Sequence, residues 1–291
     1  MFKGAIVAIV TPIKDDKIDY KSYQKLLDFQ IENKTNGILT AGCTGEPATL
    51  NYDEHKELIK FTIEYVNKRL PVIAGTGSNN TKEAIELTEY AEKVGADGAL
   101  LITPYYNKPT QKGLYLHYKE VAKSVSIPII LYNVPSRTGI SIAPETVAEL
   151  SDIKNIVGIK EASGSLDQVS KILTLIKRDD FTVLSGDDSL TLPIMAVGGK
   201  GVVSVASNIV PLLISQMVEY ALKGDYENAR KLHLKLFPIF KILFIETNPI
   251  PVKTCLSLMG MINPEWRLPL CGPSEESLEK IKKTLKEFNL L

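Results

Sequence analysis

One lysine stands at the end of a short apolar run. Lys160 follows Ile156-Val157-Gly158-Ile159 and precedes Glu161. Runs of this kind, rich in β-branched residues, are typical of a strand buried on both faces, where lysine is rarely found without a function. Burial lowers the pKa of an amine, and a neutral amine can attack a carbonyl carbon to form a Schiff base. A lysine that points into solvent from the strand end is the alternative, and the residues around it decide between the two.

Three other segments carry groups that such an amine would use. In Gly42-Cys43-Thr44-Gly45-Glu46, small residues let successive N–H groups bind a carboxylate or a phosphate. Tyr132 ends another apolar run, and its phenol can pass protons during imine formation. Arg137 follows in a loop of small polar residues, and its guanidinium can bind a carboxylate through two N–H groups. A tight turn, a core tyrosine and a solvated arginine are the plainer interpretations, each open when the segment is taken alone.

Eight short β-rich runs, bounded by Gly, Pro, Asn or Asp, must position these groups. We predict strands at 4–10, 37–41, 71–75, 98–103, 128–133, 156–161, 181–186 and 201–206. The gaps between them show helical apolar spacing, as in Tyr23, Leu26 and Ile31. Strand and helix alternating eight times over about 210 residues predict an α/β fold, the closed (β/α)8 TIM barrel, rather than a doubly wound sheet.

The repeat stops after residue 206, and only helices are predicted beyond it, at 210–222, 226–245, 251–259 and 274–288. We therefore predict a catalytic barrel over 1–224 and a C-terminal helical region over 225–291 that packs on it. Active sites of such barrels lie at the carboxyl ends of the strands. All four chemical groups named above lie at, or just after, the carboxyl ends of predicted strands, so we expect them on one rim, with Tyr132 beside Lys160.

A rim of this kind suggests an aldolase that uses a 2-oxo acid. The amine would condense with the keto group, and loss of a proton from the adjacent carbon would give an enamine that attacks an aldehyde without a metal. The acidic pair in Asp187-Asp188-Ser189 is expected to cap the following helix. Catalysis by histidine is not expected, because His55, His117 and His233 share no triad spacing.

Composition excludes several classes of function. Lys plus Arg and Asp plus Glu number 34 each, so no net charge favours nucleic acid or an anionic membrane as a partner. No apolar stretch is long enough to span a membrane, and no metal-binding or cofactor motif is found, so we expect neither a metal nor a cofactor. Three widely spaced cysteines and the lack of a targeting segment predict a cytoplasmic protein: Cys43, Cys255 and Cys271.

The chain resembles the pyruvate-dependent class I aldolases, typified by dihydrodipicolinate synthases and N-acetylneuraminate lyases. The likeness covers the whole chain and is carried by Gly42-Cys43-Thr44-Gly45-Glu46, Tyr132-Asn133-Val134-Pro135 and Gly158-Ile159-Lys160-Glu161. Four further motifs are similar to the synthases rather than to the lyases: Ile102-Thr103-Pro104-Tyr105-Tyr106-Asn107, Ser136-Arg137-Thr138-Gly139, Leu184-Ser185-Gly186-Asp187-Asp188 and Asn248-Pro249-Ile250-Pro251-Val252-Lys253.

The resemblance implies a role for each residue of the rim. Lys160 would form the imine with pyruvate, while Tyr132 shuttles protons and Thr44 holds the pyruvate carboxylate. Arg137 would meet the second substrate, L-aspartate 4-semialdehyde. The product would be a hydroxylated tetrahydrodipicolinate on the route to diaminopimelate and lysine, which makes the enzyme a lyase of amino-acid biosynthesis.

The resemblance also implies residues away from the lysine. Tyr106 would reach into the site of a neighbouring subunit as part of a proton relay, in a homotetramer built as a dimer of dimers. Gly186 and Val203 match positions that line the pyruvate pocket. Four residues match the family's allosteric lysine site, namely His55, Asn79, Glu83 and Tyr105, whereas Pro47 and Tyr52 do not resemble the sensitive bacterial form. Inhibition by L-lysine is left open, with weak or no inhibition expected.

Cys43 departs from the pattern of the synthases, in which the loop is Gly-Thr-Thr-Gly-Glu and the first threonine links two tyrosines in the relay. A thiol is a weaker hydrogen-bond donor and acceptor than a hydroxyl. Two alternatives to the synthase remain. A lyase of N-acetylneuraminate or an aldolase of 2-keto-3-deoxy sugar acids would share the lysine and the tyrosine but not Ser136-Arg137-Thr138, and a 2-oxo acid sensor would bind pyruvate without turnover.

Overall fold

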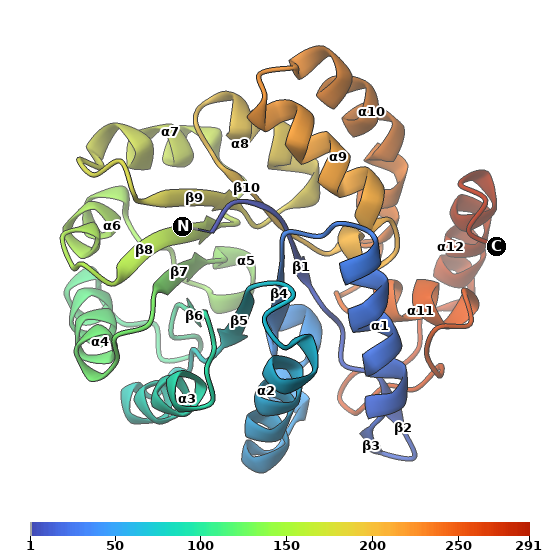
Figure 1. The fold of residues 1–291 in the computed structure, drawn as a ribbon, viewed down its shortest axis with the longest axis horizontal. Coiled ribbons are helices and arrows are strands. Elements are labelled where there is room, and N and C mark those ends of the chain that lie inside the picture. Colours follow the sequence, from blue (N-terminus) through green and yellow to red (C-terminus); the bar gives the residue numbers. More distant parts are fainter. Residues whose placement is uncertain (1) are drawn as a thin grey trace.

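Eight parallel strands close into a barrel in the computed structural model, which describes residues 2–291. Around the barrel the strands follow in sequence order, and each is succeeded by a helix on the outside (Figure 1). The predicted TIM barrel is confirmed, with each predicted strand end within two residues of the observed one. The strands are β1 (Gly4–Ala8), β4 (Gly37–Thr40), β5 (Val72–Gly75), β6 (Gly98–Ile102), β7 (Ile129–Asn133), β8 (Ile156–Glu161), β9 (Thr182–Ser185) and β10 (Gly201–Ser204).

Several helices around the barrel, among them α1, α2, α3, α4 and α7, begin at a residue whose side chain caps them. Asp19 accepts a hydrogen bond from the backbone of Ser22 at the start of α1, and Asn51 and Glu54 form a capping box at the start of α2. Two small elements were not predicted, the hairpin of β2 (Ile13–Lys14) and β3 (Lys17–Ile18) and the single turn α5 (Pro135–Thr138). The other helices are α1 (Tyr20–Glu32), α2 (Tyr52–Val66), α3 (Thr81–Lys93), α4 (Gln111–Ser124), α6 (Pro144–Ser151), α7 (Leu166–Leu175), α8 (Thr191–Ala196) and α9 (Pro211–Leu222).

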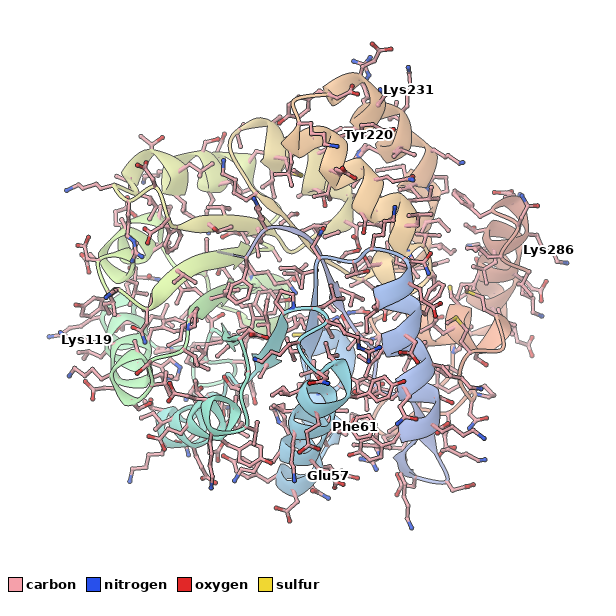
Figure 2. All side chains as sticks on the ribbon, in the orientation of Figure 1. Glu57, Phe61, Lys119, Tyr220, Lys231 and Lys286 are labelled. Atoms are coloured by element: carbon pink, nitrogen blue, oxygen red, sulfur yellow. The ribbon has the colours of Figure 1, made fainter. Side chains whose placement is uncertain are left out.

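Side chains alternate between the inside of the barrel and the layer beneath the helices, as the twofold period of a strand requires. The interior is filled by one apolar cluster, which includes Ile6, Leu39, Ile130 and Val203. Charged side chains such as Lys119 extend outward from the helices (Figure 2). The barrel is therefore a packed core, and chemistry is confined to its rim.

The C-terminal region forms three helices that lie to one side of the barrel (Figure 1). They are α10 (Tyr226–Ile242), α11 (Ile250–Leu258) and α12 (Glu275–Glu287), close to the predicted ranges. The apolar cluster that contains Val7 and Val202 of the barrel continues into Leu236, Val252 and Leu285 of these helices. The helical tail is thus packed on the barrel as predicted, while the division at residues 224 and 225 stays a prediction.

Glycine is required where β8 meets β9. A Cβ atom at Gly158 would lie 2.5 Å from the carbonyl oxygen of Thr182, which belongs to the backbone of the neighbouring strand. At Gly37 of β4 the nearest atoms to a Cβ lie at 3.4 Å, an ordinary contact.

We expect Gly158→Ala to lower the free energy of unfolding by about 1–3 kcal/mol, because the added methyl group forces β8 and β9 apart. Gly37→Ala is the matched control, since it also adds a methyl group to a barrel strand, and should change stability by less than about 1 kcal/mol. Urea denaturation followed by circular dichroism measures both. Equal stability of the two variants would contradict this account.

Candidate active site

The predicted neighbours Lys160 and Tyr132 lie side by side. Tyr132 of β7 pairs with Lys160 of β8, and the lysine Nζ atom lies 4.1 Å from the centre of the tyrosine ring. Both side chains are buried, with 4% of Lys160 and 5% of Tyr132 exposed. An amine and a phenol therefore share one desolvated place at the carboxyl rim of the barrel.

A bulge between the two strands produces this pairing. Ile129 pairs with Ile156, but the next residue, Ile130, pairs with Gly158, so one residue of β8 is extra. Without the shift, Tyr132 would stand opposite the residue before Lys160, and that lysine would face the other side of the sheet. Bulges near active sites commonly re-aim a side chain in this way.

Burial sets the protonation of both groups. It lowers the pKa of Lys160 to about 8, an effect that electrostatic interactions with Cys43 and Asp188 partly oppose and that Arg137 reinforces. Burial raises the pKa of the Tyr132 phenol well above its usual value. Near pH 7 roughly a tenth of the amine is neutral, while the phenol keeps its proton. The pair thus offers a nucleophile and a proton donor together.

The turn after β4 lies on the same rim. Cys43–Gly45 form a single 3-10 turn, and Thr11 Oγ1 donates a 2.6 Å hydrogen bond to the Gly45 carbonyl. The side chain of Thr44 is buried, and its hydroxyl accepts a 3.0 Å hydrogen bond from Asn248 Nδ2. The segment expected as a candidate anion seat is therefore also a tight turn. Thr11 of the barrel holds one part of this turn, and Asn248 of the C-terminal region holds another.

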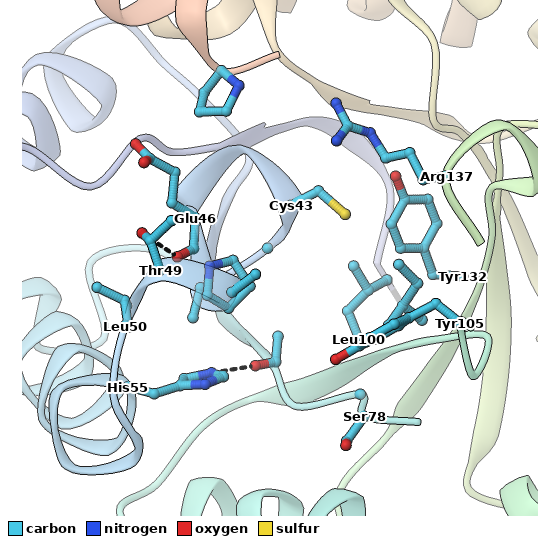
Figure 3. Close-up of a pocket in the computed structure, with 18 of the residues that line it drawn as sticks. Cys43, Glu46, Thr49, Leu50, His55, Ser78, Leu100, Tyr105, Tyr132 and Arg137 are labelled. Atoms are coloured by element: carbon cyan, nitrogen blue, oxygen red, sulfur yellow. Dashed lines mark hydrogen bonds between the residues drawn. The ribbon is translucent and has the colours of Figure 1, made fainter. Parts of the chain in front are cut away.

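A cavity of about 470 Å³ opens beside the buried amine. Cys43, Tyr105, Tyr132 and Arg137 line it, and the Cys43 sulfur points toward Tyr132 and Arg137 (Figure 3). Lys160 is not among the lining residues, because it lies against the ring of Tyr132, which is. The volume is in the range of sites for small molecules.

Arg137 reaches the cavity from α5, in the loop after β7. Its Nη2 atom donates a 2.9 Å hydrogen bond to the carbonyl of Asn248. The loop is held at its base by Asn133, whose Oδ1 accepts from Ile142 N at 3.0 Å and whose Nδ2 donates to Glu161 Oε2 at 3.0 Å. Glu161, the residue directly after Lys160, therefore helps to anchor the loop that carries Arg137.

Comparison with known proteins agrees with this geometry. The model of the dihydrodipicolinate synthetase family matches residues 1–288. The chain belongs to this family. A curated relative from Persephonella marina, named 4-hydroxy-tetrahydrodipicolinate synthase, is 56% identical over 293 residues, which cover both proteins fully.

Solved structures of the family superpose closely. The dihydrodipicolinate synthase of Aquifex aeolicus has a TM-score of 0.98 and 50% identity, with 99% of each chain covered. The enzyme of Acinetobacter baumannii, solved in complex with pyruvate, has a TM-score of 0.97 and 46% identity, with both chains covered fully.

Five of the residues that the family resemblance singled out lie close to the cavity or on it. Gly186 packs on the lysine, since a Cβ atom there would stand 3.1 Å from Lys160 Cε. Val203 belongs to the interior cluster that includes Tyr132. His55 and Glu83 line an extension of the cavity between α2 and α3, together with Tyr105.

Two others lie apart from it. Asn79 does not line the cavity but donates a 3.2 Å hydrogen bond to the Tyr105 carbonyl. Tyr106 points out from the rim, with 89% of its surface exposed. Which of these residues act in this member of the dihydrodipicolinate synthetase family stays a prediction.

The acidic pair after β9 divides into two roles. Asp187 accepts a 2.8 Å hydrogen bond from Ser189 N, which is the predicted cap. Asp188 is buried and instead accepts hydrogen bonds from Ser204 Oγ and from the backbone of Val205 and Ala206, which fixes the end of β10. Burial raises the pKa of Asp188 to about 6. This second role was missed, because adjacent aspartates look alike in a sequence.

Asn248 and the buried pair of Glu46 and Lys253 were also missed as parts of the site. Asn248 and Lys253 belong to a motif that served only to recognise the family, and Glu46 was considered only as the end of the candidate anion seat. The spacing of these residues in the chain gives no sign that they contact one another. Within residues 2–291, no three His, Cys, Asp or Glu side chains gather as a metal site would require. Over the same range, none of the helices combines the length and the apolar character needed to cross a membrane.

Proposed function

We propose that Lys160 is the Schiff-base nucleophile of a lyase that condenses pyruvate with L-aspartate 4-semialdehyde. The activity is that of 4-hydroxy-tetrahydrodipicolinate synthases, the name carried by curated relatives that are over 50% identical along the full chain. The observation that carries the assignment of Lys160 is its burial against Tyr132, with Nζ 4.1 Å from the ring centre. It supplies a neutral amine and a proton donor at one point.

The reaction then follows from the groups on the rim. The neutral amine attacks the keto carbon of pyruvate, and water leaves once the hydroxyl of the adduct has taken a proton from Tyr132. Loss of a proton from the methyl carbon gives the enamine, which attacks the aldehyde carbon of the second substrate. The amino group of that substrate finally displaces Lys160 as the ring closes, and this step frees the enzyme.

The two carboxylates need separate seats. For pyruvate we assign the turn at Thr44, whose hydroxyl and neighbouring amides lie at the carboxyl end of β4. For the second substrate we assign Arg137. Among residues 2–291 only its Nη2 atom makes a hydrogen bond, to Asn248, so the other N–H groups of the guanidinium can bind a carboxylate.

A neighbouring subunit completes the site in this proposal. Tyr106 is 89% exposed, has a left-handed backbone with φ of 69°, and follows β6 on the catalytic rim. A large aromatic side chain in such a position suits a contact between subunits. We assign it to the proton relay of a partner, in a homotetramer. The three free cysteines support a reducing compartment, the cytoplasm.

Reduction with borohydride in the presence of pyruvate tests the nucleophile. We expect one stable adduct, on the peptide that contains Lys160, and turnover when L-aspartate 4-semialdehyde replaces borohydride. Lys160→Arg keeps a positive charge but should give neither adduct nor turnover. Peptide mass mapping locates the adduct. Labelling elsewhere would sink the mechanism, and an adduct without turnover would indicate a 2-oxo acid sensor.

Imine formation should depend on pH through Lys160. Below its pKa of about 8 the amine holds a proton and has no free electron pair, so the rate should rise about tenfold per pH unit in acid and level off above pH 8. Tyr132 does not interfere, because its own pKa is raised. Rapid mixing with pyruvate and quenching with borohydride gives the profile. A flat profile between about pH 6 and pH 9 would contradict the assigned pKa.

Cys43→Thr tests whether the thiol matters. The sulfur lines the cavity beside Tyr132, where it offers a single weak hydrogen bond, so the variant should keep its activity within about tenfold, equivalent to about 1 kcal/mol. Steady-state kcat and KM for both substrates measure the effect. A much larger loss would show that the sulfur has a role that a hydroxyl cannot replace.

A further inference from the structure

A buried ion pair ties the C-terminal region to the turn that follows β4. Lys253 Nζ of α11 lies 2.7 Å from Glu46 Oε1, and their side chains are 1% and 2% exposed. The second carboxylate oxygen, Oε2, has no hydrogen-bond partner among the residues described here. Glu46 ends the turn, and its carboxylate is directed away from Tyr132 and Arg137 (Figure 3). Glu46 is one of the residues that line the cavity, whereas Lys253 is not, so the ion pair connects the cavity wall to α11.

Stability alone is a weak reason for such a pair. Two charges lose their hydration when they are buried, and apolar side chains of similar volume often stabilise a fold as well or better. Burial also lowers the pKa of Lys253, and the charge of Glu46 opposes that change. The pair is better explained by what it holds in place.

What it holds is a constrained backbone. Glu46 has φ of 57° and ψ of 43°, the left-handed region that non-glycine residues rarely adopt. Its N–H donates to the Cys43 carbonyl at 3.2 Å, and its own carbonyl accepts from Thr49 N at 2.9 Å. Glu46 thus connects the turn to the segment that leads into α2. The ion pair of its side chain fixes the backbone at this connection.

The C-terminal segment 248–253 contacts the turn at a second point. Asn248, five residues before Lys253, donates to the Thr44 hydroxyl at 3.0 Å and accepts from Arg137 through its backbone carbonyl at 2.9 Å. The two ends of this segment therefore hold Thr44 and Glu46, which flank Gly45. One short piece of the C-terminal region fixes both sides of the turn.

We propose that the ion pair of Glu46 and Lys253 is a positioning device that holds the turn at Thr44 in the conformation that binds the carboxylate of a 2-oxo acid. The proposal rests on the function assigned to Thr44 and Lys160 above. Neither member of the pair touches the reacting atoms, so their effect reaches the reaction through the turn.

The test separates substrate binding from chemistry. We expect Lys253→Met and Glu46→Gln each to raise KM for pyruvate roughly tenfold or more, since small displacements of binding groups have large effects, with kcat within about threefold. Lys160 should still be labelled with borohydride when pyruvate is saturating. Lys280→Met, which breaks an exposed 2.6 Å ion pair with Glu276, is the matched control and should leave KM unchanged.

The double variant Glu46→Gln/Lys253→Met removes both charges and tests the competing explanation. We expect its melting temperature to recover toward that of the wild type while KM for pyruvate stays raised. Recovery of both would show that the pair only stabilises the fold. If Lys253→Met fails to fold, Glu46→Gln decides, because its amide keeps the volume and can still accept from Lys253.

The two proposals fail in different ways. If wild-type Lys160 is not labelled, the assigned function is wrong before any variant is made. If the wild type is labelled and folded variants need the same pyruvate concentration for half-maximal labelling, only the positioning role of the ion pair is wrong.

Discussion

The pairing of β7 with β8 is the constraint on which the rest of the site depends. It brings Lys160 against Tyr132, and it does so only because β8 carries one extra residue near Ile156. Strand side chains alternate, so a shift of one residue would exchange the inside of the barrel for the outside. Gly158 allows the backbones to approach after the bulge, since any larger residue would meet the carbonyl of Thr182. The desolvation that lowers the pKa of the lysine is thus a consequence of strand register.

The barrel supplies the proposed reacting groups, and the C-terminal region holds in place the residues proposed to bind the substrates around them. Asn248 contacts both the turn at Thr44 and the guanidinium of Arg137. Because these two residues are the proposed seats for two carboxylates, one residue of the tail sets the distance between them. The shared apolar core makes that placement rigid, since Val252 of α11 packs in the same cluster as Val7 of β1. The C-terminal region is therefore a structural part of the proposed site.

Much of this could be predicted from the sequence, for physical reasons. Repeated strands and helices with clear apolar periods fixed the order of the strands, and the direction of a parallel barrel then placed Lys160, Tyr132 and Arg137 on one rim. The contacts of Asn248 and Lys253 could not be predicted in this way, because they join residues more than 100 positions apart, and no local pattern encodes that proximity. The bulge in β8 was missed for a related reason, since a buried strand with an extra residue keeps the same apolar appearance.

Two buried lysines in this chain show why one is the proposed nucleophile and the other is not. Burial lowers the pKa of both. Lys253 has a carboxylate oxygen of Glu46 at 2.7 Å, which favours its charged form and occupies its ammonium group. Lys160 has no carboxylate oxygen within 4.0 Å among residues 2–291, and its neighbour is the face of an aromatic ring. A ring attracts an ammonium group less strongly than a carboxylate does, so the proton is released more readily. The difference between structural support and chemistry therefore comes from the group that faces each amine, and not from burial itself.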